Sequence, residues 1–458
     1  MAERRPNILL LFTDDQRFNT IAALGNDAIH TPNLDALVAE GTAFRRAHIM
    51  GGTSGAVCMP SRAMLHSGRT LFHIQGQGQE IPPDHTTLGE HLRANGYETF
   101  GTGKWHNGTA AYTRSFSDGA EIFFGGMHDH WNVPACDYRP DGDYPVHNFV
   151  RDPWHTNNVK QMVGEHVQCG VHSTDLFADA TTEFLTRRPA DKPFFAYVSF
   201  MAPHDPRTMP PQYLEMYPPE EIELPANFMP EHPFDNGELV IRDEQLAPTP
   251  RTPGEIRRHI AEYYAMISHL DDAVGRIVDA LKAGGEYENT IIAFAGDNGL
   301  AVGSHGLMGK QNLYDHSVRV PLILAGPGVP KGETNDSLAC LTDLFATLCD
   351  LTELPTPDSV EGPSLAPALT GGPPPREEML LAYRHLQRGV SDGRWKLIEY
   401  LVDGVRTRQV FDLHNDPDEL NNLAETETGN QQAARLRPAL LRWRDELDDP
   451  HDFWNDCE

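Results

Sequence analysis

Positive charge is scarce in this sequence. Its 458 residues include 37 Lys and Arg but 66 Asp and Glu, which gives a formal net charge of −29. A surface this acidic repels nucleic acid and anionic lipid, so we expect neither as a partner. If the substrate is itself an anion, cations must be concentrated where it binds. The acidic surplus is equally a feature of salt tolerance, and the sequence leaves that alternative open.

Long apolar runs and paired-cysteine motifs are also missing. No stretch reaches the roughly 20 apolar residues of a membrane-spanning helix, and the run before Asp14 is shorter than a secretory signal requires. We therefore expect a cytoplasmic protein, or a periplasmic or secreted one if a leader was removed. The six cysteines have no CxxC spacing, which argues against a zinc ribbon and a disulfide framework. Five are expected to be free thiols, and Cys58 is considered below.

Short apolar runs alternate with helical patterns over about the first 370 residues. The runs are typical of strands covered on both faces, so we expect an α/β fold with a large, mostly parallel sheet sandwiched by helices. The expected strands are Asn7–Phe12, Phe194–Phe200, Thr290–Ala295 and Val320–Ala325. The expected helices are Asn33–Glu40, Thr87–Ala94, Thr174–Thr186 and Glu255–Ala283.

A Gly- and Pro-rich segment, residues 371–375, indicates a linker. The sequence therefore predicts a main α/β domain over residues 1–370 and a C-terminal α+β subdomain over residues 376–458. The subdomain is expected to hold a small antiparallel sheet and a closing amphipathic helix at about Gln431–Glu446. Its expected strands are Met379–Tyr383, Gly389–Ser391, Trp395–Tyr400 and Gln409–Leu413.

Two segments of the main domain show little periodicity. Residues 125–172 contain six histidines together with Trp131 and Trp154, and residues 203–254 are rich in proline. Long irregular insertions in compact domains are usually functional or disordered. We expect these two segments to wall the binding site and to determine the choice of substrate.

Acidic and amide side chains follow two of the predicted strands. Asp14 and Asp15 come directly after the first strand, and Asp297 and Asn298 follow the strand Thr290–Ala295. The carboxyl ends of parallel strands share one edge of a sheet, where ligands gather. Four oxygen donors there suit Ca²⁺ or Mg²⁺ better than zinc.

A third motif surrounds Cys58, which lies just before a predicted helix start at Pro60 and one turn from Arg62. A cysteine at a helix N-terminus beside an arginine lies in a site that attracts anions. The segment resembles the signature C-x-P-S-R-x-x-x-x-[ST]-G of the type I sulfatases, members of the alkaline-phosphatase-like superfamily. In that family the cysteine is oxidised to formylglycine. The matching residues are Cys58, Pro60, Ser61, Arg62, Ser67 and Gly68.

Further segments resemble elements of the same family. Lys104 and His106 lie in a GKWH element, His204 lies in an APH element, and Lys310 ends a G-x-HG-x-x-GK element. The resemblance covers nearly the whole chain, about residues 7–423. His305 of the last element is equally well explained as a structural residue near the metal loop.

The resemblance implies hydrolysis of sulfate esters. It implies a formylglycine at position 58 as nucleophile, with Arg62, Lys104 and Lys310 neutralising the sulfate. His106 is the expected base for the formylglycine hydrate, and His204 or Lys310 the expected proton donor to the leaving group. The metal, Ca²⁺ or secondarily Mg²⁺, is expected on Asp14, Asp15, Asp297 and Asn298, with the modified Cys58 as a further ligand. Maturation implies a formylglycine-generating enzyme as partner.

The substrate is expected to be an anionic sulfated small molecule or saccharide. The aromatic residues of the irregular segment 125–172 favour a sulfated carbohydrate, because aromatic rings pack on pyranose faces. Lys104, His204 and Lys310 are expected to contact it, and so are Trp131, Trp154, His155 and Arg251. The alternative that the aromatic residues are simply core remains open. A phosphonate monoester or phosphodiester hydrolase with the same site is the second enzyme hypothesis. A binding protein whose Cys58 is never modified is the third.

Overall fold

The structure, a computed structural model, describes residues 5–150, 158–188 and 191–454. An eight-stranded sheet forms its centre, in the order β13-β2-β12-β11-β1-β10-β4-β5. All neighbouring pairs in it are parallel except the two made by β12. The strands are β1 (Asn7–Thr13), β2 (Gly41–His48), β4 (Glu98–Lys104), β5 (Asp118–Phe123), β10 (Phe194–Ser199), β11 (Thr290–Gly296), β12 (Leu322–Ala325) and β13 (Glu333–Cys340).

The central strand β1 shows why the apolar runs predict this sheet. All seven of its residues are buried, and Leu9 pairs in parallel register with Ala196 of β10 and Ile292 of β11. A strand covered on both faces by helices needs continuous rather than alternating apolar residues. The expected strand at 320–325 is present but shorter, since β12 begins at Leu322.

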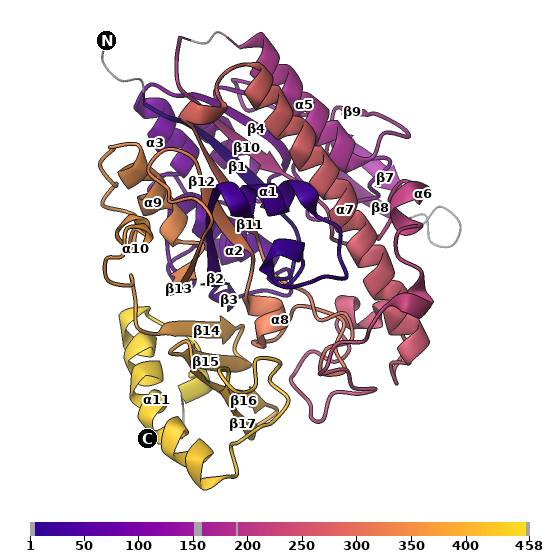
Figure 1. The fold of residues 1–458 in the computed structure, drawn as a ribbon, viewed down its shortest axis with the longest axis vertical. Coiled ribbons are helices and arrows are strands. Elements are labelled where there is room, and N and C mark those ends of the chain that lie inside the picture. The colour runs from indigo at the N-terminus through magenta and orange to yellow at the C-terminus, as the bar shows by residue number, and fades with distance from the viewer. Residues whose placement is uncertain (1–4, 151–157, 189–190, 455–458) are drawn as a thin grey trace.

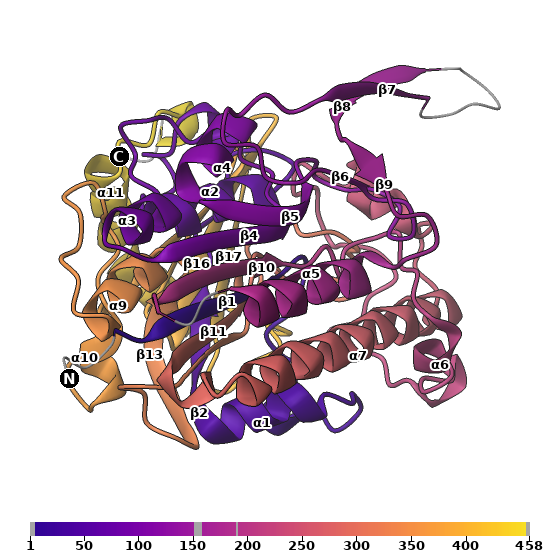
Figure 2. The same ribbon diagram turned by 90° about the horizontal axis from the view of Figure 1, so that it is seen from above.

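Two layers of helices cover the sheet (Figure 1; Figure 2). The helices α1 (Pro32–Glu40), α5 (Ser173–Arg187) and α7 (Pro253–Ala283) lie on one face, where Leu9 and Leu11 join their core. The helices α2 (Cys58–Ser67), α3 (Leu88–Ala94), α4 (Thr109–Ser115) and α9 (Asp343–Leu351) lie on the other, where Ile8 and Leu10 are buried. The predicted α/β sandwich is confirmed.

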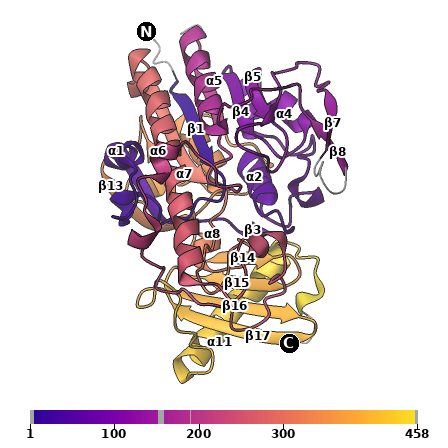
Figure 3. The same ribbon diagram turned by 90° about the vertical axis from the view of Figure 1, so that its right-hand side faces the viewer.

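The C-terminal part forms the predicted smaller sheet with its closing helix (Figure 3). Its strands are β14 (Met379–Tyr383), β15 (Gln387–Ser391), β16 (Trp395–Val402) and β17 (Val405–Asp412), and α11 (Glu427–Glu446) packs on it. These four strands pair antiparallel. A short strand from the N-terminal part, β3 (Gly51–Gly52), adds in parallel to β14 and joins the two sheets.

Both aperiodic segments are largely irregular, with short elements only. Residues 203–254 contain α6 (Pro211–Leu214) and 3₁₀ turns. The other segment forms the short pair β6 (Pro134–Ala135) and β9 (His166–Val167), and a hairpin of β7 (Val146–Val150) and β8 (Val159–Val163). This hairpin projects from the body of the molecule (Figure 2). The remaining short helices are α8 (Asp315–Val318) and α10 (Ala366–Leu369).

The described part of the chain contains no helix long and apolar enough to span a bilayer. The cysteines within it, Cys58, Cys136, Cys169, Cys340 and Cys349, are free thiols, which agrees with the prediction for the four other than Cys58. All of these but Cys169 are buried. Cys457 lies outside the described residues.

Candidate active site

The ends of β1 and β11 bring the four predicted metal ligands together. The two strands run side by side, with Thr13 opposite Gly296. Beyond them the Asp297 amide N–H donates to the Thr13 carbonyl (3.0 Å), and the Asp15 N–H donates to Asp297 Oδ1 (3.0 Å). Asp15 adopts a left-handed backbone conformation (φ 65°), which turns the chain sharply at the sheet edge. The Asn298 amide donates to Asp15 Oδ1 (2.7 Å).

This cluster has the donor chemistry of a hard-cation site. Asp14 Oδ1 and Asn298 Oδ1 are buried and have no hydrogen-bond partner within the described residues. Ligand atoms of Asp14, Cys58 and Asp297 lie within 4.8 Å of one another, and so do those of Asp14, Asp15 and His204. Buried unpartnered carboxylate and amide oxygens fit a divalent cation such as Ca²⁺ or Mg²⁺.

The two carboxyl groups nearest Cys58 have pKa values shifted in opposite directions. Burial, followed by the charge of Asp14, raises the pKa of Asp297 to about 7. Burial opposes ionisation of Asp14 as well, but Lys104, His204 and Arg62 hold the pKa of Asp14 well below its usual value. A bound cation would relieve the repulsion by which Asp14 raises the pKa of Asp297, so the pair is complementary to a cation.

Cys58 begins helix α2, two residues ahead of Pro60. Its side chain is buried, with Lys104 Nζ 3.5 Å and His106 Nδ1 3.6 Å from Sγ. Arg62, one turn along, donates through Nε to Asp297 Oδ2 (2.9 Å) and through Nη1 to the Lys104 carbonyl (2.9 Å). Arg62 therefore lies behind the carboxylates and joins α2 to the ends of β4 and β11.

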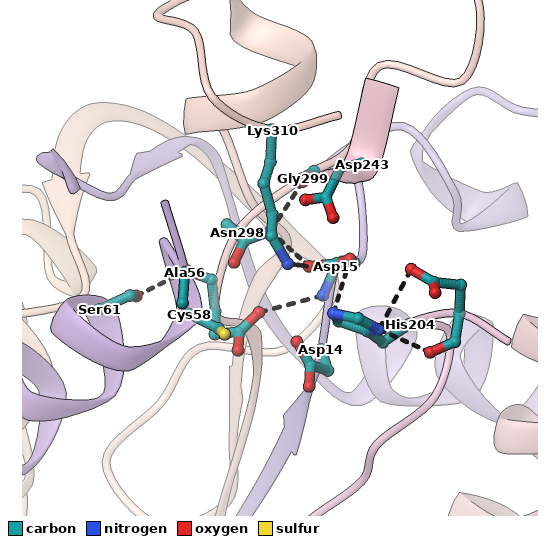
Figure 4. Close-up of polar contacts among 12 residues, drawn as sticks. Asp14, Asp15, Ala56, Cys58, Ser61, His204, Asp243, Asn298, Gly299 and Lys310 are labelled. Atoms are coloured by element: carbon teal, nitrogen blue, oxygen red, sulfur yellow. Dashed lines mark hydrogen bonds and ion pairs between the residues drawn. The ribbon is translucent and has the colours of Figure 1, made fainter. Parts of the chain in front are cut away.

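Three more predicted side chains converge on the cluster, and Figure 4 shows two of them, His204 and Lys310. Lys104 donates to Asp14, and Lys310 Nζ donates to Asp15 Oδ1 at 2.5 Å. His204 Nε2 lies 3.7 Å from Asp15 Oδ2. Burial lowers the pKa of Lys310, but Asp15, Cys58 and Asp243 more than offset it and raise that pKa well above its usual value. Burial and the charge of Lys104 keep the pKa of His106 well below its usual value.

Sequence reasoning missed the residues that hold His204. Its Nδ1 lies 2.8 Å from the Asp205 carbonyl oxygen and 3.4 Å from Asp205 Oδ1. Arg242 donates to the Asp205 carboxylate and to Asp243 Oδ1 (3.0 Å). His130, from the histidine-rich segment, is buried with Nε2 3.0 Å from the His204 carbonyl oxygen. Only the enrichment in histidine hinted at this support.

A cavity of about 600 Å³ opens above Cys58. Both aperiodic segments wall it, as expected, through residues 125–127, 160–163 and 241–243. His106, His204 and Lys310 also line it. The remaining lining residues are Gly55, Ala56, Gln79, Phe124 and Gln311.

Of the four residues predicted from sequence to contact the alcohol part of the substrate, the two that the structure describes do not line this cavity. Trp131, one of these two, packs its ring against that of His172 at 5.1 Å, and its contact with substrate stays a prediction. Trp154 and His155 lie outside the described residues. His305 stacks on Tyr314 (3.9 Å) and its Nε2 lies 3.0 Å from the Glu419 carbonyl oxygen, in keeping with the structural alternative.

The substrate contact predicted for Arg251 is corrected to a structural role. It is 3% exposed, lies outside the cavity lining, and donates to Glu244 Oε2 (2.6 Å) and to the carbonyls of Gly306 and Ala247. Its guanidinium holds the segment before α7 in place through these three hydrogen bonds, and it does not face the cavity. The position of an arginine in an aperiodic segment does not reveal its buried carboxylate partner.

Replacing Arg251 by methionine is therefore expected to destabilise the fold by about 3 kcal/mol, because the buried Glu244 loses its charged partner and keeps only the N–H groups of Met308 and Gly309. Urea unfolding of the wild type and the variant measures this difference. The ratio of kcat/KM between a large and a small sulfate ester should stay the same. A selective loss on the large ester at unchanged stability would return Arg251 to the binding site.

The comparisons with known proteins show the family to which the chain belongs. The family model described as sulfatase matches residues 6–354. The chain belongs to the sulfatase family. A second model, N-sulphoglucosamine sulphohydrolase C-terminal, matches residues 303–446 of this sulfatase. The family assignment places the chain among the sulfuric ester hydrolases.

Relatives of this sulfatase span nearly its full length. It is 25% identical to an N-acetylglucosamine-6-O-sulfatase of Bacteroides thetaiotaomicron (97% of this chain, 86% of that protein). It is 28% identical to an arylsulfatase of Clostridium perfringens (96% and 94%).

Solved structures share its fold. The sulfatase superposes on BT4656, solved in complex with its substrate D-glucosamine-2-N,6-O-disulfate, with a TM-score of 0.77 at 22% identity (98% and 99% of the two chains). It superposes on a phosphonate monoester hydrolase of Agrobacterium radiobacter with a TM-score of 0.75 at 23% identity (97% and 96%).

Proposed function

We propose that this sulfatase hydrolyses sulfate esters of carbohydrates, with formylglycine formed from Cys58 as nucleophile and a divalent cation beside it. One observation carries the proposal. Cys58 lies at the floor of a 600 Å³ cavity, at the start of α2, between Lys104, His106 and the strand-end carboxylates. A sulfate ester is an anion with a poor leaving group, and its cleavage needs a positioned nucleophile, neutralising charge and a proton donor.

The carboxylates and the amide at the strand ends would hold the cation. Asp14, Asp15, Asp297 and Asn298 offer oxygen atoms only, which favours Ca²⁺, with Mg²⁺ second. The cation supplies charge that offsets the sulfate oxygens in a chain of net charge −29. A formylglycine-generating enzyme is the partner that maturation of Cys58 requires.

The histidines around Cys58 would transfer protons, and the lysines would bind the sulfate. Once modified to formylglycine and hydrated, residue 58 would supply the attacking hydroxyl. His106 Nδ1, 3.6 Å from Cys58 Sγ, is placed to accept a proton there. Lys104 and Lys310 carry ammonium groups on the two sides of Asp14 and Asp15 and orient the sulfate. His204 Nε2 faces the same cluster while Nδ1 is held by Asp205, so Nε2 is free to protonate the departing alcohol.

A carbohydrate is favoured as the alcohol part. The relatives include an N-acetylglucosamine-6-O-sulfatase and a protein of Formosa agariphila called an ulvan-active sulfatase, to which this chain is 27% identical. The fold is shared with BT4656 bound to a disulfated glucosamine. The cavity volume suits one or two sugar rings.

Phosphonate monoester or phosphodiester hydrolysis is the second candidate. It is favoured by the likeness to the Agrobacterium phosphonate monoester hydrolase and by 28% identity to a multifunctional alkaline phosphatase superfamily protein of Trinickia caryophylli. The family model and the first relatives favour sulfate.

Parallel assays decide between the two functions. The substrates are 4-nitrophenyl sulfate, 4-nitrophenyl phenylphosphonate and a phosphate diester of 4-nitrophenol. All three release 4-nitrophenol, so they differ in the sulfur or phosphorus centre that is attacked. With fully matured protein, we expect kcat/KM for the sulfate to exceed that for the other two by at least about tenfold. A higher kcat/KM for the phosphonate or the diester would replace the proposed function by the second candidate.

A further inference from the structure

The cavity above Cys58 concentrates positive charge in a strongly acidic chain. Three of its lining side chains are cationic, those of Lys160, Arg242 and Lys310, and one, that of Asp243, is anionic. The whole chain, by contrast, carries a net charge of −29. A local excess of cations against such a background raises the local concentration of anionic ligands.

Two of these cations are already engaged by carboxylates. Lys310 Nζ donates to Asp15 at the floor of the cavity, and Arg242 donates to Asp205 and Asp243. Lys160, on the hairpin strand β8, differs. It is exposed and makes no side-chain hydrogen bond or ion pair with any residue that the structure describes. Its ammonium group is thus available to a ligand.

The wall near Lys160 is suited to a sugar ring. Gln79 and Gln161 line the cavity with exposed amides that have no side-chain partner among the described residues. Phe124, Met127 and Met162 supply apolar surface beside them. Free amides bind hydroxyl groups, and the apolar surface packs on the face of a ring, so the mixture fits a saccharide better than a small alkyl sulfate.

We propose that Lys160 binds a second anionic group of the substrate, which makes the preferred substrates sulfated saccharides with a further sulfate or carboxylate besides the ester that is cleaved. This inference rests on the proposed function, since the cleaved sulfate occupies the Cys58 end of the same cavity. The second anion would then bind Lys160, which, unlike Lys310 and Arg242, is not paired with a carboxylate of any described residue. A charge-assisted hydrogen bond of this kind strengthens binding about tenfold or more.

The test compares matched substrates that differ by one anionic group. One pair is D-glucosamine-2-N,6-O-disulfate and N-acetylglucosamine 6-sulfate, and the other is 2-O-sulfated glucuronate and 2-O-sulfated glucose. The proteins are the wild type, Lys160→Gln, Lys160→Arg, and the control Lys282→Gln, whose ammonium lies over Tyr287 outside the cavity. The readout is the kcat/KM ratio of the doubly to the singly charged member of each pair.

We expect the wild type to prefer the doubly charged member of at least one pair. The pair that shows this preference identifies the second group as sulfate or carboxylate. Lys160→Gln should lower that ratio about tenfold, Lys160→Arg should retain most of it, and Lys282→Gln should leave it unchanged. A wild type without the preference, or a ratio unaffected by Lys160→Gln, overturns the inference. Failure of the wild type to hydrolyse even 4-nitrophenyl sulfate would instead overturn the proposed function.

Discussion

Replacing Cys58 by alanine is expected to abolish turnover of every sulfate ester, with kcat at least about a thousandfold below that of the wild type. The reason is that the covalent step is lost while the binding cations remain. Lys104 and Lys310 keep their contacts with Asp14 and Asp15, so a sulfate ester should still bind. Steady-state kinetics and isothermal titration of the variant with substrate measure the two quantities separately.

Two further variants sharpen this prediction. Cys136→Ala removes another buried cysteine, outside the cavity lining, and is expected to retain activity. Cys58→Ser is expected to accept sulfate once but not to release it, because a serine lacks the second hydroxyl of the hydrate. Multiple turnovers by Cys58→Ala would remove position 58 from the chemistry.

Replacing Asp297 by asparagine is expected to lower kcat/KM about a hundredfold or more and to remove the tightly bound divalent cation. The change keeps the shape of the side chain but removes its negative charge. A carboxylate oxygen of Asp297 lies within 4.8 Å of a carboxylate oxygen of Asp14 and of Cys58 Sγ, so the lost charge lies at the proposed cation site.

Asp297 Oδ1 accepts from the Asp15 N–H and its Oδ2 from Arg62, so asparagine keeps one of these two acceptors. Arg62 still donates to the Lys104 carbonyl and to Ser199 Oγ, so we expect the variant to fold. Elemental analysis of the purified variant and circular dichroism measure cation content and fold.

Asp271→Asn is the matched control for Asp297→Asn. Asp271 is equally buried, but it accepts from Asn33 and Leu34 at the start of α1, away from Cys58. We expect this variant to keep its cation and its activity. A cation retained by Asp297→Asn, at wild-type activity, would place the metal elsewhere.

The strand-end part of the site was predictable from sequence because it depends on short-range patterns. Continuous apolar runs predict buried parallel strands, and the residues that follow them must share one sheet edge. Asp14, Asp15, Asp297 and Asn298 meet for this reason. The placement of Cys58 at the start of α2 follows from the preference of proline for the first helical turn.

The walls of the site depend on long-range contacts that carry no periodic signal. Arg242 lies 37 residues from Asp205, and His130 lies 74 residues from His204. All four residues belong to the two aperiodic segments. The prediction that Trp131 and Arg251 contact the substrate rests on their residue types and on their location in the two aperiodic segments. In the structure Trp131 is half-buried against His172, and Arg251 is buried and paired with Glu244. Residue type indicates what a side chain can do, but burial decides what it faces.

The same limit applies to the fold. The antiparallel direction of β12 and the addition of β3 to the second sheet are not encoded in local composition. A two-residue strand such as Gly51–Gly52 gives no recognisable run. It is held by its pairing with Ala382 and Tyr383, which are more than 300 residues away in the chain.

The most direct test of the central claim is the mass of the peptide that contains Cys58, measured in protein samples of different specific activity. Cells with and without a formylglycine-generating enzyme provide such samples. We expect the aldehyde form of position 58 to rise in proportion to sulfate-ester hydrolysis, and protein made without the enzyme to carry the thiol and to be nearly inactive. Fully active protein whose Cys58 is entirely an unmodified thiol would contradict the account.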